Sequence, residues 1–198
     1  MYIQLTNRCN MECAHCGMDC TAEGEDMAFD TFKACIEHND NIIIGGGEPT
    51  IHPEFEKFLF YALAHCESVY IITNGKETDI ALALAKLNKM NEEGYAFGAE
   101  LSQDSYHETI DQKVVDAFQG YIRDNDDRTL NAGRCDWGED ECICERDAFV
   151  LPNGEVNQCG CGDSPCVGNV FDGFEPMGDG FDWGCHKKVH NKENEIAA

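Results

Sequence analysis

The first 134 residues alternate short apolar runs with longer amphipathic stretches. Four runs rich in β-forming residues predict strands at 2–6, 41–45, 68–73 and 95–101. Apolar residues recur at helical spacing in the other stretches, which predicts helices at 28–38, 53–66, 78–91 and 108–123. We expect a fifth strand at 128–132. Such alternation is typical of β-α units around a parallel sheet and predicts an α/β protein.

The pattern changes after Gly133. Seven of the thirteen cysteines lie between Cys135 and Cys185, glycines become frequent, and helical periodicity ends. We therefore expect a main α/β unit at 1–134 and a small cysteine-rich extension at 135–198, which bound ligands hold together in place of a large core. Within the extension, two β-like runs flank Asn153-Gly154, a residue pair that strongly favours a β-hairpin.

Composition argues against several classes of protein. Every apolar run is shorter than the roughly 20 residues that span a bilayer, so we expect no membrane protein. The N-terminal residues lack the pattern of a signal peptide, which predicts a cytoplasmic location. Thirteen cysteines there indicate metal or redox chemistry more than disulfides, and the odd number rules out complete internal pairing. A net charge of −24 repels a phosphate backbone and argues against direct nucleic-acid binding.

The candidate chemistry begins with C-N-M-E-C-A-H-C at 9–16, followed by Cys20. Four cysteines so close in sequence suit a zinc site, one half of each of two disulfides, or an iron-sulfur site. A zinc ribbon normally brings two C-x2-C pairs on separate knuckles, whereas the spacing here is C-x3-C-x2-C directly after a strand. Three thiolates in one loop can hold three irons of a cubane and leave the fourth iron open. Cys20 lies outside this triplet, and we expect it to stay off the metal, either as a buried thiol or with a substrate-facing or redox role.

The spacing resembles the hallmark of the radical S-adenosylmethionine (SAM) enzymes. Three further stretches agree with that family in order and position: G-G-G-E-P at 45–49, I-T-N-G at 72–75 and E-L-S-Q-D at 100–104. The resemblance implies a parallel β/α barrel. Members typically have six β-α units, but only about four and a fifth strand fit before Cys135, so we expect a partial barrel with one open side.

The resemblance also implies cofactors and a mechanism. A 4Fe-4S cluster on Cys9, Cys13 and Cys16 would bind the methionyl amine and carboxylate of SAM at its open iron. One electron would then cleave the sulfonium and release a 5'-deoxyadenosyl radical, which abstracts a substrate hydrogen. A reducing partner such as flavodoxin or ferredoxin would supply the electron.

Eight residues outside the cysteines are implied to bind SAM. Gly46 and Gly47 would present backbone groups to its amino-acid part, since glycine permits close approach at a strand end. Glu48 would accept hydrogen bonds from the ammonium group. His15 would pack on the nucleoside, and Ser102, Gln103 and Asp104 would face the ribose. Asn74, from I-T-N-G, completes this set. Two plainer alternatives stay open: a structural turn at 46–48, and helix capping by Asp104 and His107.

A second resemblance is to the SPASM or twitch extensions that carry auxiliary iron-sulfur clusters. Cys144-x9-Gly154-x4-Cys159 matches the opening of that pattern, N-A-G-R at 131–134 precedes it, and V-G-N-V at 167–170 follows. The x1 and x4 spacings after Cys159 depart from the two-cluster pattern, so we expect one auxiliary 4Fe-4S cluster. Cys144 and Cys159 are the first ligands, and the spacing does not choose among the others. Structural zinc is the alternative. The predicted ligands are Cys142, Cys144, Cys159, Cys161 and Cys166, with Cys135 and Cys185 as further candidates.

The substrate is the least determined feature. Family members with such extensions often modify peptides or protein side chains, and this is the function we expect. Radical modification or isomerisation of a small amino-acid-derived or nucleoside-linked substrate is an alternative. A non-catalytic iron-sulfur or zinc protein is a third, against which the G-G-G-E-P stretch argues.

Overall fold

The structure is a computed structural model, and it describes residues 1–37, 39–91, 96–124, 129, 131–137, 148–161 and 164–172. The strands form one sheet in the order β5-β4-β3-β2-β1-β6-β7-β8. Neighbours from β5 through β6 are parallel, whereas β6, β7 and β8 pair antiparallel. The predicted α/β class and the open partial barrel are confirmed.

The first four strands lie close to the predicted ranges. They are β1 (Tyr2–Thr6), β2 (Asn41–Gly46), β3 (Ser68–Thr73) and β4 (Phe97–Ser102). Their inward positions are apolar and fully buried, as with Ile3, Ile44 and Ile71. Burial of these side chains is the main source of stability for a sheet covered by helices.

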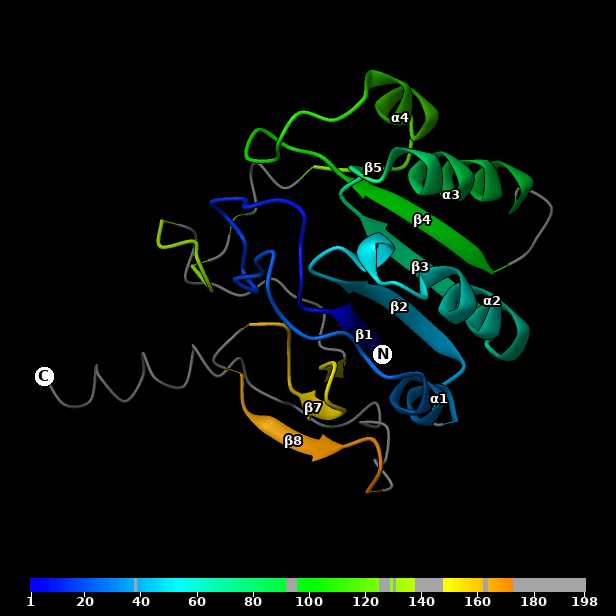
Figure 1. Ribbon diagram of the computed structural model, residues 1–198, viewed down its shortest axis with the longest axis vertical. Coiled ribbons are helices and arrows are strands. Elements are labelled where there is room, and N and C mark those ends of the chain that lie inside the picture. Colours follow the sequence, from blue (N-terminus) through cyan, green and yellow to red (C-terminus); the bar gives the residue numbers. More distant parts are fainter. Residues whose placement is uncertain are drawn as a thin grey trace, which may run out of the picture.

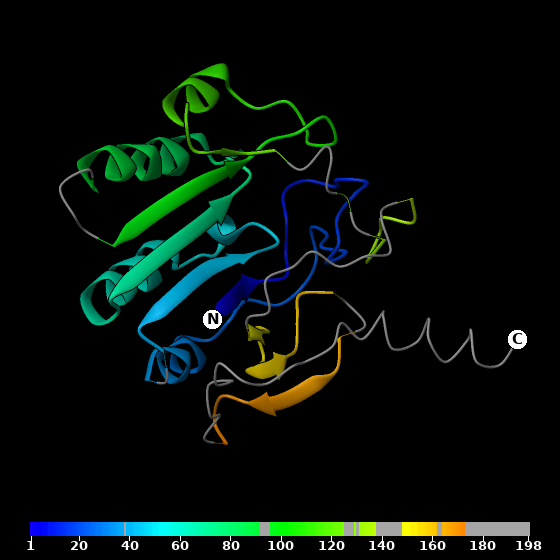
Figure 2. The same ribbon diagram turned by 180° about the vertical axis from the view of Figure 1, so that it is seen from behind.

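The helices follow the strands along one side of the sheet, away from the loop that follows β1 (Figures 1 and 2). They are α1 (Phe29–Glu37), the short 3-10 helix η1 (Pro49–Ile51), α2 (Phe55–His65), α3 (Thr78–Met90) and α4 (Gln112–Ala117). Phe32 and Phe58 pack edge to face, with ring centroids 4.8 Å apart, and join α1 to α2 over the sheet. The predictions for the first three helices at 28–38, 53–66 and 78–91 are therefore confirmed to within two residues.

The region after β4 differs from its prediction. The helix expected at 108–123 is only α4, which Asp111 caps by accepting a hydrogen bond from the Lys113 N–H at 3.0 Å. The chain then turns at Gly120, where φ is +91°, a conformation that favours glycine and ends helices. The strand next to β4 is β5 (Ile122–Arg123), which is parallel to it. Of the strand predicted at 128–132, the described residues 129, 131 and 132 belong to no strand. Residues 125–128 and 130 lie outside the described residues.

The predicted hairpin is present and extends the main sheet. Strand β6 (Phe149–Val150) pairs parallel with β1 and antiparallel with β7 (Glu155–Asn157), and β8 (Cys166–Asn169) follows. Gly154 adopts φ +88° in the turn between β6 and β7. Val150 and Val156 belong to the same buried cluster as the strands of the barrel. The described part of the extension therefore shares the barrel's core, on the side that the sequence suggested was open.

The part of the chain that the structure describes contains no helix long and apolar enough to cross a membrane.

Candidate functional site

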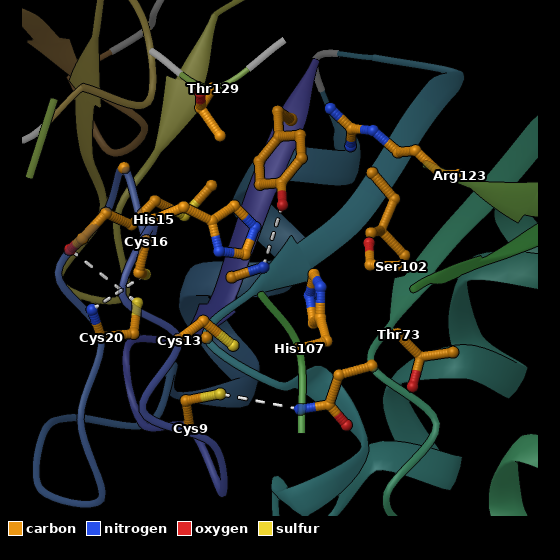
Figure 3. Close-up of a pocket in the computed structure, with 17 residues that line it drawn as sticks. Cys9, Cys13, His15, Cys16, Cys20, Thr73, Ser102, His107, Arg123 and Thr129 are labelled. Carbon is orange, nitrogen blue, oxygen red and sulfur yellow. Dashed lines mark hydrogen bonds between the residues drawn. The ribbon is translucent and has the colours of Figure 1, made fainter. Parts of the chain in front are cut away.

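A cavity of about 250 Å³ opens where the parallel strands end. Figure 3 shows that side chains from the loop after β1 line one wall and that residues from the ends of β3, β4 and β5 line the other. Ligands of parallel α/β sheets collect at this edge. Eight of the predicted site residues line the cavity: Cys9, Cys13, His15, Cys16, Gly46, Gly47, Asn74 and Ser102.

The three cysteines of the motif all face this cavity. The loop that carries them begins directly after β1, and the Cys9 N–H donates to the Thr21 carbonyl at 2.6 Å, which closes the loop at its base. Arg8 and Asp26 form a two-pronged ion pair at the same base, with the closest atoms 2.7 Å apart. The cysteine loop thus extends from the end of β1, and these contacts hold its two ends together.

Burial and the neighbouring cysteines change the pKa values of these thiols. Burial raises the pKa of Cys9, and burial together with the neighbouring Cys9 and Cys16 raises the pKa of Cys13 to about 11. The Cys20 thiol, which hydrogen-bonds to the Cys16 sulfur, lowers the pKa of Cys16 to about 5, and Arg134 acts in the same direction. A thiolate is the metal-binding form. Cys9 and Cys13, whose pKa values are raised, would therefore ionise readily only with a metal cation bound between them.

Cys20 also lines the cavity and is buried. Its N–H donates to the Cys16 sulfur at 3.4 Å, and its hydrogen bond to Cys16 raises the pKa of its own thiol. Cys20 thus contacts the Cys16 sulfur through both its backbone N–H and its thiol. That it stays off the metal remains a prediction.

The glycine loop after β2 packs against the backbone of the cysteine loop. The Gly47 N–H donates to the Thr6 carbonyl at 2.8 Å, and the Glu48 N–H donates to the Arg8 carbonyl at 2.9 Å. A Cβ atom on Gly47 would lie 2.0 Å from the Arg8 carbonyl oxygen, and Gly46 has φ +135°. Both positions require glycine because the two loops touch main chain to main chain.

Glu48 is fully buried and does not line the cavity. One carboxylate oxygen accepts hydrogen bonds from the Thr50 N–H, the Thr50 hydroxyl and the Thr73 hydroxyl at 3.1, 2.5 and 2.8 Å. The other accepts from the Asn74 N–H at 2.6 Å. The structure thus gives Glu48 a positioning role between β2 and β3, and its expected contact with an ammonium group stays a prediction.

Asn74 connects the end of β3 to the cysteine loop. Its side-chain amide donates to the Cys9 sulfur at 3.7 Å and to the Asn10 side chain at 2.9 Å. Lys76 reinforces this contact, because its ammonium group donates to the Asn10 carbonyl at 2.6 Å and pairs with Glu108 at 2.5 Å. An amide N–H directed at a ligand sulfur is one of the protein's means of tuning an iron-sulfur centre.

Asp104 lies behind the cavity wall, between two imidazoles. Its Oδ1 atom is 2.7 Å from His107 Nδ1, and its Oδ2 atom is 3.2 Å from His15 Nε2. The Tyr106 N–H also donates to Oδ1, at 3.0 Å. Burial lowers the pKa of His15, so this ring is neutral at pH 7. Its Nδ1 atom is buried without a hydrogen-bond partner among the described residues and remains available to a ligand.

These contacts refine two predictions. Asp104 orients His15 and His107, both of which line the cavity, whereas Asp104 and Gln103 do not. The Gln103 N–H pairs with the Arg123 carbonyl at 3.1 Å as part of the sheet edge. The contacts of Gln103 and Asp104 with a ribose therefore stay predictions.

Sequence patterns did not identify several cavity residues. Tyr2 stacks on Phe149, with centroids 4.7 Å apart, and its hydroxyl accepts a hydrogen bond from the Gly46 N–H at 3.0 Å. Arg123, at the end of β5, brings a positive charge to the wall opposite the cysteines (Figure 3). The alternation of apolar and polar residues gives no signal for either. The helix-ending Gly120 is the feature that could have placed Arg123 on a strand.

The cysteines of the extension are only partly described. Cys159, Cys161 and Cys166 lie in or next to the connection between β7 and β8, where the Gln158 N–H donates to the Pro165 carbonyl at 3.1 Å. Cys161 is buried and Cys166 is exposed. Cys135, a further candidate, is buried beside the cysteine loop, where Ala132 and Cys135 form a bridge. Cys142, Cys144 and Cys185 lie outside the described residues.

The residues present fit an iron-sulfur cluster with a bound nucleoside-containing ligand. Three thiols that line one cavity suit a positively charged metal centre, and the sulfur of Cys9 already receives an N–H donor. The unpartnered nitrogen of His15 and the adjacent glycine backbone provide polar contacts for a ligand next to the thiols. Every one of these features faces the same cavity.

Comparison with known proteins gives matches to several curated relatives, whereas no protein-family model matches the sequence. The chain is 28% identical over 129 residues to the antilisterial bacteriocin subtilosin biosynthesis protein AlbA of Bacillus subtilis, covering 59% of this chain and 26% of AlbA. It is 33% identical over 81 residues to the mycofactocin maturase MftC of Mycobacterium ulcerans, covering 36% of this chain and 21% of MftC. It is 29% identical over 132 residues to the Fe-coproporphyrin III synthase of Methanosarcina barkeri, covering 60% of this chain and 31% of that protein.

Among solved structures, one match is Streptococcus suis SuiB bound to S-adenosylmethionine, at 15% identity and a TM-score of 0.47, covering 86% of this chain and 63% of SuiB. The chain spans less than a third of the length of each curated relative that it matches.

The cysteine motif, the cavity that it lines and the sequence matches agree on one class of protein. The matches support membership of the radical SAM superfamily, which the sequence resemblance predicted.

Proposed function

We propose that this chain is a radical SAM enzyme that reductively cleaves SAM and abstracts a hydrogen atom from its substrate. The observation that carries this proposal is the convergence of Cys9, Cys13 and Cys16 on one cavity at the carboxyl ends of parallel strands. When bound, a 4Fe-4S cluster at these cysteines supplies the electron that converts SAM to methionine and a 5'-deoxyadenosyl radical.

The chain's own residues position the reaction. Asn74 donates a hydrogen bond to the Cys9 sulfur, which favours the more negative, reduced state of a centre held there. The neutral ring of His15, oriented by Asp104, offers an acceptor nitrogen for a nucleoside amino or hydroxyl group. The contacts between the glycine loop and the cysteine loop hold Gly46 and Gly47 in the cavity wall. Their backbone would there approach the amino-acid part of SAM.

We propose a peptide or protein side chain as the substrate. The support is the similarity to AlbA and MftC, whose names are a bacteriocin biosynthesis protein and a mycofactocin maturase. The similarity to an Fe-coproporphyrin III synthase supports the second candidate, a small-molecule substrate. Identification of the substrate and its product will determine the class of reaction, whether oxidation, isomerisation or transfer.

We also propose one auxiliary 4Fe-4S cluster in a cluster-bearing extension at 135–198. The position of Cys159, Cys161 and Cys166 in or next to the short connection between β7 and β8 supports a shared ligand site. The remaining ligands would come from Cys142, Cys144 and their neighbours. Because SAM cleavage consumes an electron, the enzyme requires a reductant, for which flavodoxin or ferredoxin in the cytoplasm is suitable.

The test is anaerobic reconstitution with iron and sulfide, followed by dithionite and SAM. We expect about eight irons per chain and formation of 5'-deoxyadenosine, detected by mass spectrometry. Replacing Cys9, Cys13 and Cys16 by alanine should abolish cleavage and leave about four irons. A fully loaded protein that does not cleave SAM would contradict the enzyme assignment and favour a non-catalytic iron-sulfur protein. Zinc without residual iron in the triple variant would contradict the auxiliary cluster.

The substrate class has its own test. A short precursor peptide encoded beside this gene should acquire a mass change on incubation with the loaded enzyme, SAM and dithionite. The triple cysteine variant is the control, because it should leave the same peptide unchanged. An unmodified peptide, together with turnover of a small amino-acid-derived or nucleoside-linked compound, would favour the second candidate.

A further inference from the structure

The segment at 131–135, where the extension begins, lies directly on the cysteine loop. The Arg134 N–H donates to the Cys16 carbonyl at 2.9 Å. Gly133 adopts φ +56°, and a Cβ atom there would lie 2.5 Å from the Gly17 carbonyl oxygen and 2.6 Å from that of Cys16. The two backbones therefore touch, more than a hundred residues apart in sequence.

The Arg134 guanidinium joins three points of the same loop. Its Nη1 atom donates to the Cys13 carbonyl at 3.2 Å, its Nη2 atom donates to the Cys20 carbonyl at 2.7 Å, and its Nε atom donates to Asp19 at 3.0 Å. The rigid, forked guanidinium suits such divergent acceptors, whereas a lysine ammonium presents a single point charge. One side chain thus spans the loop from its second cysteine to Cys20.

The position of this charge matters in so acidic a protein. The chain has 38 acidic and 14 basic residues, and Arg134 brings one of those few cations to the loop that carries the ligand thiols. A fixed positive charge near a metal centre stabilises its more negative, reduced state. Arg134 acts on the cluster loop in two separable ways, through its hydrogen-bond geometry and through its charge.

We propose that Arg134 is a positioning residue that latches the segment leading into the extension onto the cysteine loop, and that its charge raises the reduction potential of the cluster held there. The second half rests on the proposed function, because it requires a cluster at Cys9, Cys13 and Cys16. The latch itself is a property of the protein without metal. The segment at 131–134 therefore acts on the first cluster in addition to leading to the second cysteine-rich site.

The latch is tested on the metal-free protein by hydrogen exchange of the amides at 13–20. We expect Arg134→Gln to speed exchange there by about tenfold, because charge-assisted hydrogen bonds to two carbonyls are lost. Lys113→Gln is the charge-matched control, since this exposed lysine pairs only with Asp111 among the contacts that the structure describes for its ammonium group. Unchanged exchange in Arg134→Gln would overturn the latch. If that variant does not fold, Asp19→Asn, which weakens one contact, should speed exchange to a smaller extent, and unchanged exchange in it counts against the latch.

The charge is tested on the reconstituted protein by a redox titration monitored by electron paramagnetic resonance. The variant with Cys9, Cys13 and Cys16 replaced by alanine gives the signal of the auxiliary cluster alone, and this signal is subtracted. We expect Arg134→Gln to lower the ratio of reduced to oxidised cluster at Cys9, Cys13 and Cys16, measured at a fixed potential, by about threefold or more. Arg134→Lys should keep the wild-type ratio but lose iron to a chelator faster, because lysine keeps the charge and loses the fork.

The outcomes separate the two proposals. Equal ratios in wild type and Arg134→Gln would overturn the role of the charge. A wild-type protein whose signal does not change in the triple cysteine variant would overturn the proposed function, while the exchange measurement would still decide whether the latch exists.

Discussion

The carboxylate of Glu48 accepts a hydrogen bond from the backbone N–H of Asn74 at 2.6 Å. This bond joins the glycine loop after β2 to the loop after β3, and it holds Asn74 where its side chain reaches the Cys9 sulfur. Burial raises the pKa of the Glu48 carboxyl, whereas hydrogen bonds from Thr50, Thr73 and Asn74 favour its charged form. Among the described residues, these three supply its four hydrogen-bond donors. The stretches at 45–49 and 72–75, which resemble cofactor-binding loops, are thus joined by hydrogen bonds and together hold the Asn74 side chain at the Cys9 sulfur.

Replacing Glu48 by alanine should destabilise the metal-free protein. The change leaves the buried Asn74 N–H and the Thr73 hydroxyl without their acceptor, at a cost of about 3 kcal/mol in the free energy of unfolding. Urea unfolding measures this loss. Glu54→Ala, an exposed acidic residue on the same segment, is the control and should change stability little. A Glu48→Ala protein of normal stability that has lost only its affinity for SAM would favour the direct ammonium contact instead.

Replacing Gly47 by alanine should disturb the cysteine loop. Its new methyl group would meet the Arg8 carbonyl at 2.0 Å and push the adjacent Cys9 out of place. We expect a loss of about 1–3 kcal/mol in the free energy of unfolding and poor incorporation of the first cluster. Iron analysis after reconstitution measures the second effect. Gly120→Ala is the matched control, because its Cβ meets nothing within 4 Å and only backbone strain is added. Equal iron content in both variants would contradict this prediction.

Replacing Asp104 by asparagine should weaken SAM binding without removing iron. Asparagine removes the charge and replaces one carboxylate oxygen by an NH2 group, so Asp104 loses its favourable contact with either His15 or His107. We expect about a tenfold loss of affinity for SAM, measured by equilibrium dialysis on the reconstituted protein. Asp111→Asn removes the same charge at an exposed helix cap nearby and should bind SAM normally. Normal binding by Asp104→Asn would indicate that Asp104 only caps the turn at Tyr106.

The sequence located the cysteine triplet and the glycine loop because each is a local motif. Spacing alone brings Cys9, Cys13 and Cys16 into one loop, and glycine at a strand end indicates close backbone contact. The first four strands followed from the alternation of apolar runs and amphipathic stretches. Local patterns also found the hairpin at Asn153-Gly154, although they could not place it beside β1, since sheet order depends on long-range pairing.

The features that the sequence missed are contacts between distant segments. Arg134 meets carbonyls that precede it by 114 and 121 residues, and Tyr2 meets the N–H of Gly46. No period or motif encodes such contacts. The misplaced fifth strand has a local cause, because the apolar residues at 114–122 continue a helical pattern through the stop at Gly120. A helix-ending glycine therefore outweighs periodicity at this point.

The stability of the metal-free protein should fall below pH 6.5 through His52. Burial lowers the pKa of this ring from its ordinary 6.5. Its Nδ1 atom accepts a hydrogen bond from the Glu54 N–H at 3.1 Å, and its Nε2 atom lies 3.1 Å from the Met27 carbonyl, so the neutral ring donates there. As the pH falls from 6.5 toward the lower folded pKa, the unfolded chain binds a proton that the folded protein does not, and the free energy of unfolding decreases.

Urea unfolding at pH 7.5 and pH 5.5 measures this dependence. The wild-type protein should lose stability between the two values, and His52→Gln should lose less, because glutamine does not titrate. His65→Gln, which removes an exposed histidine on α2, is the matched control. The same loss of stability in wild type and His52→Gln would show that other groups, and not this buried imidazole beside η1, carry the acid sensitivity.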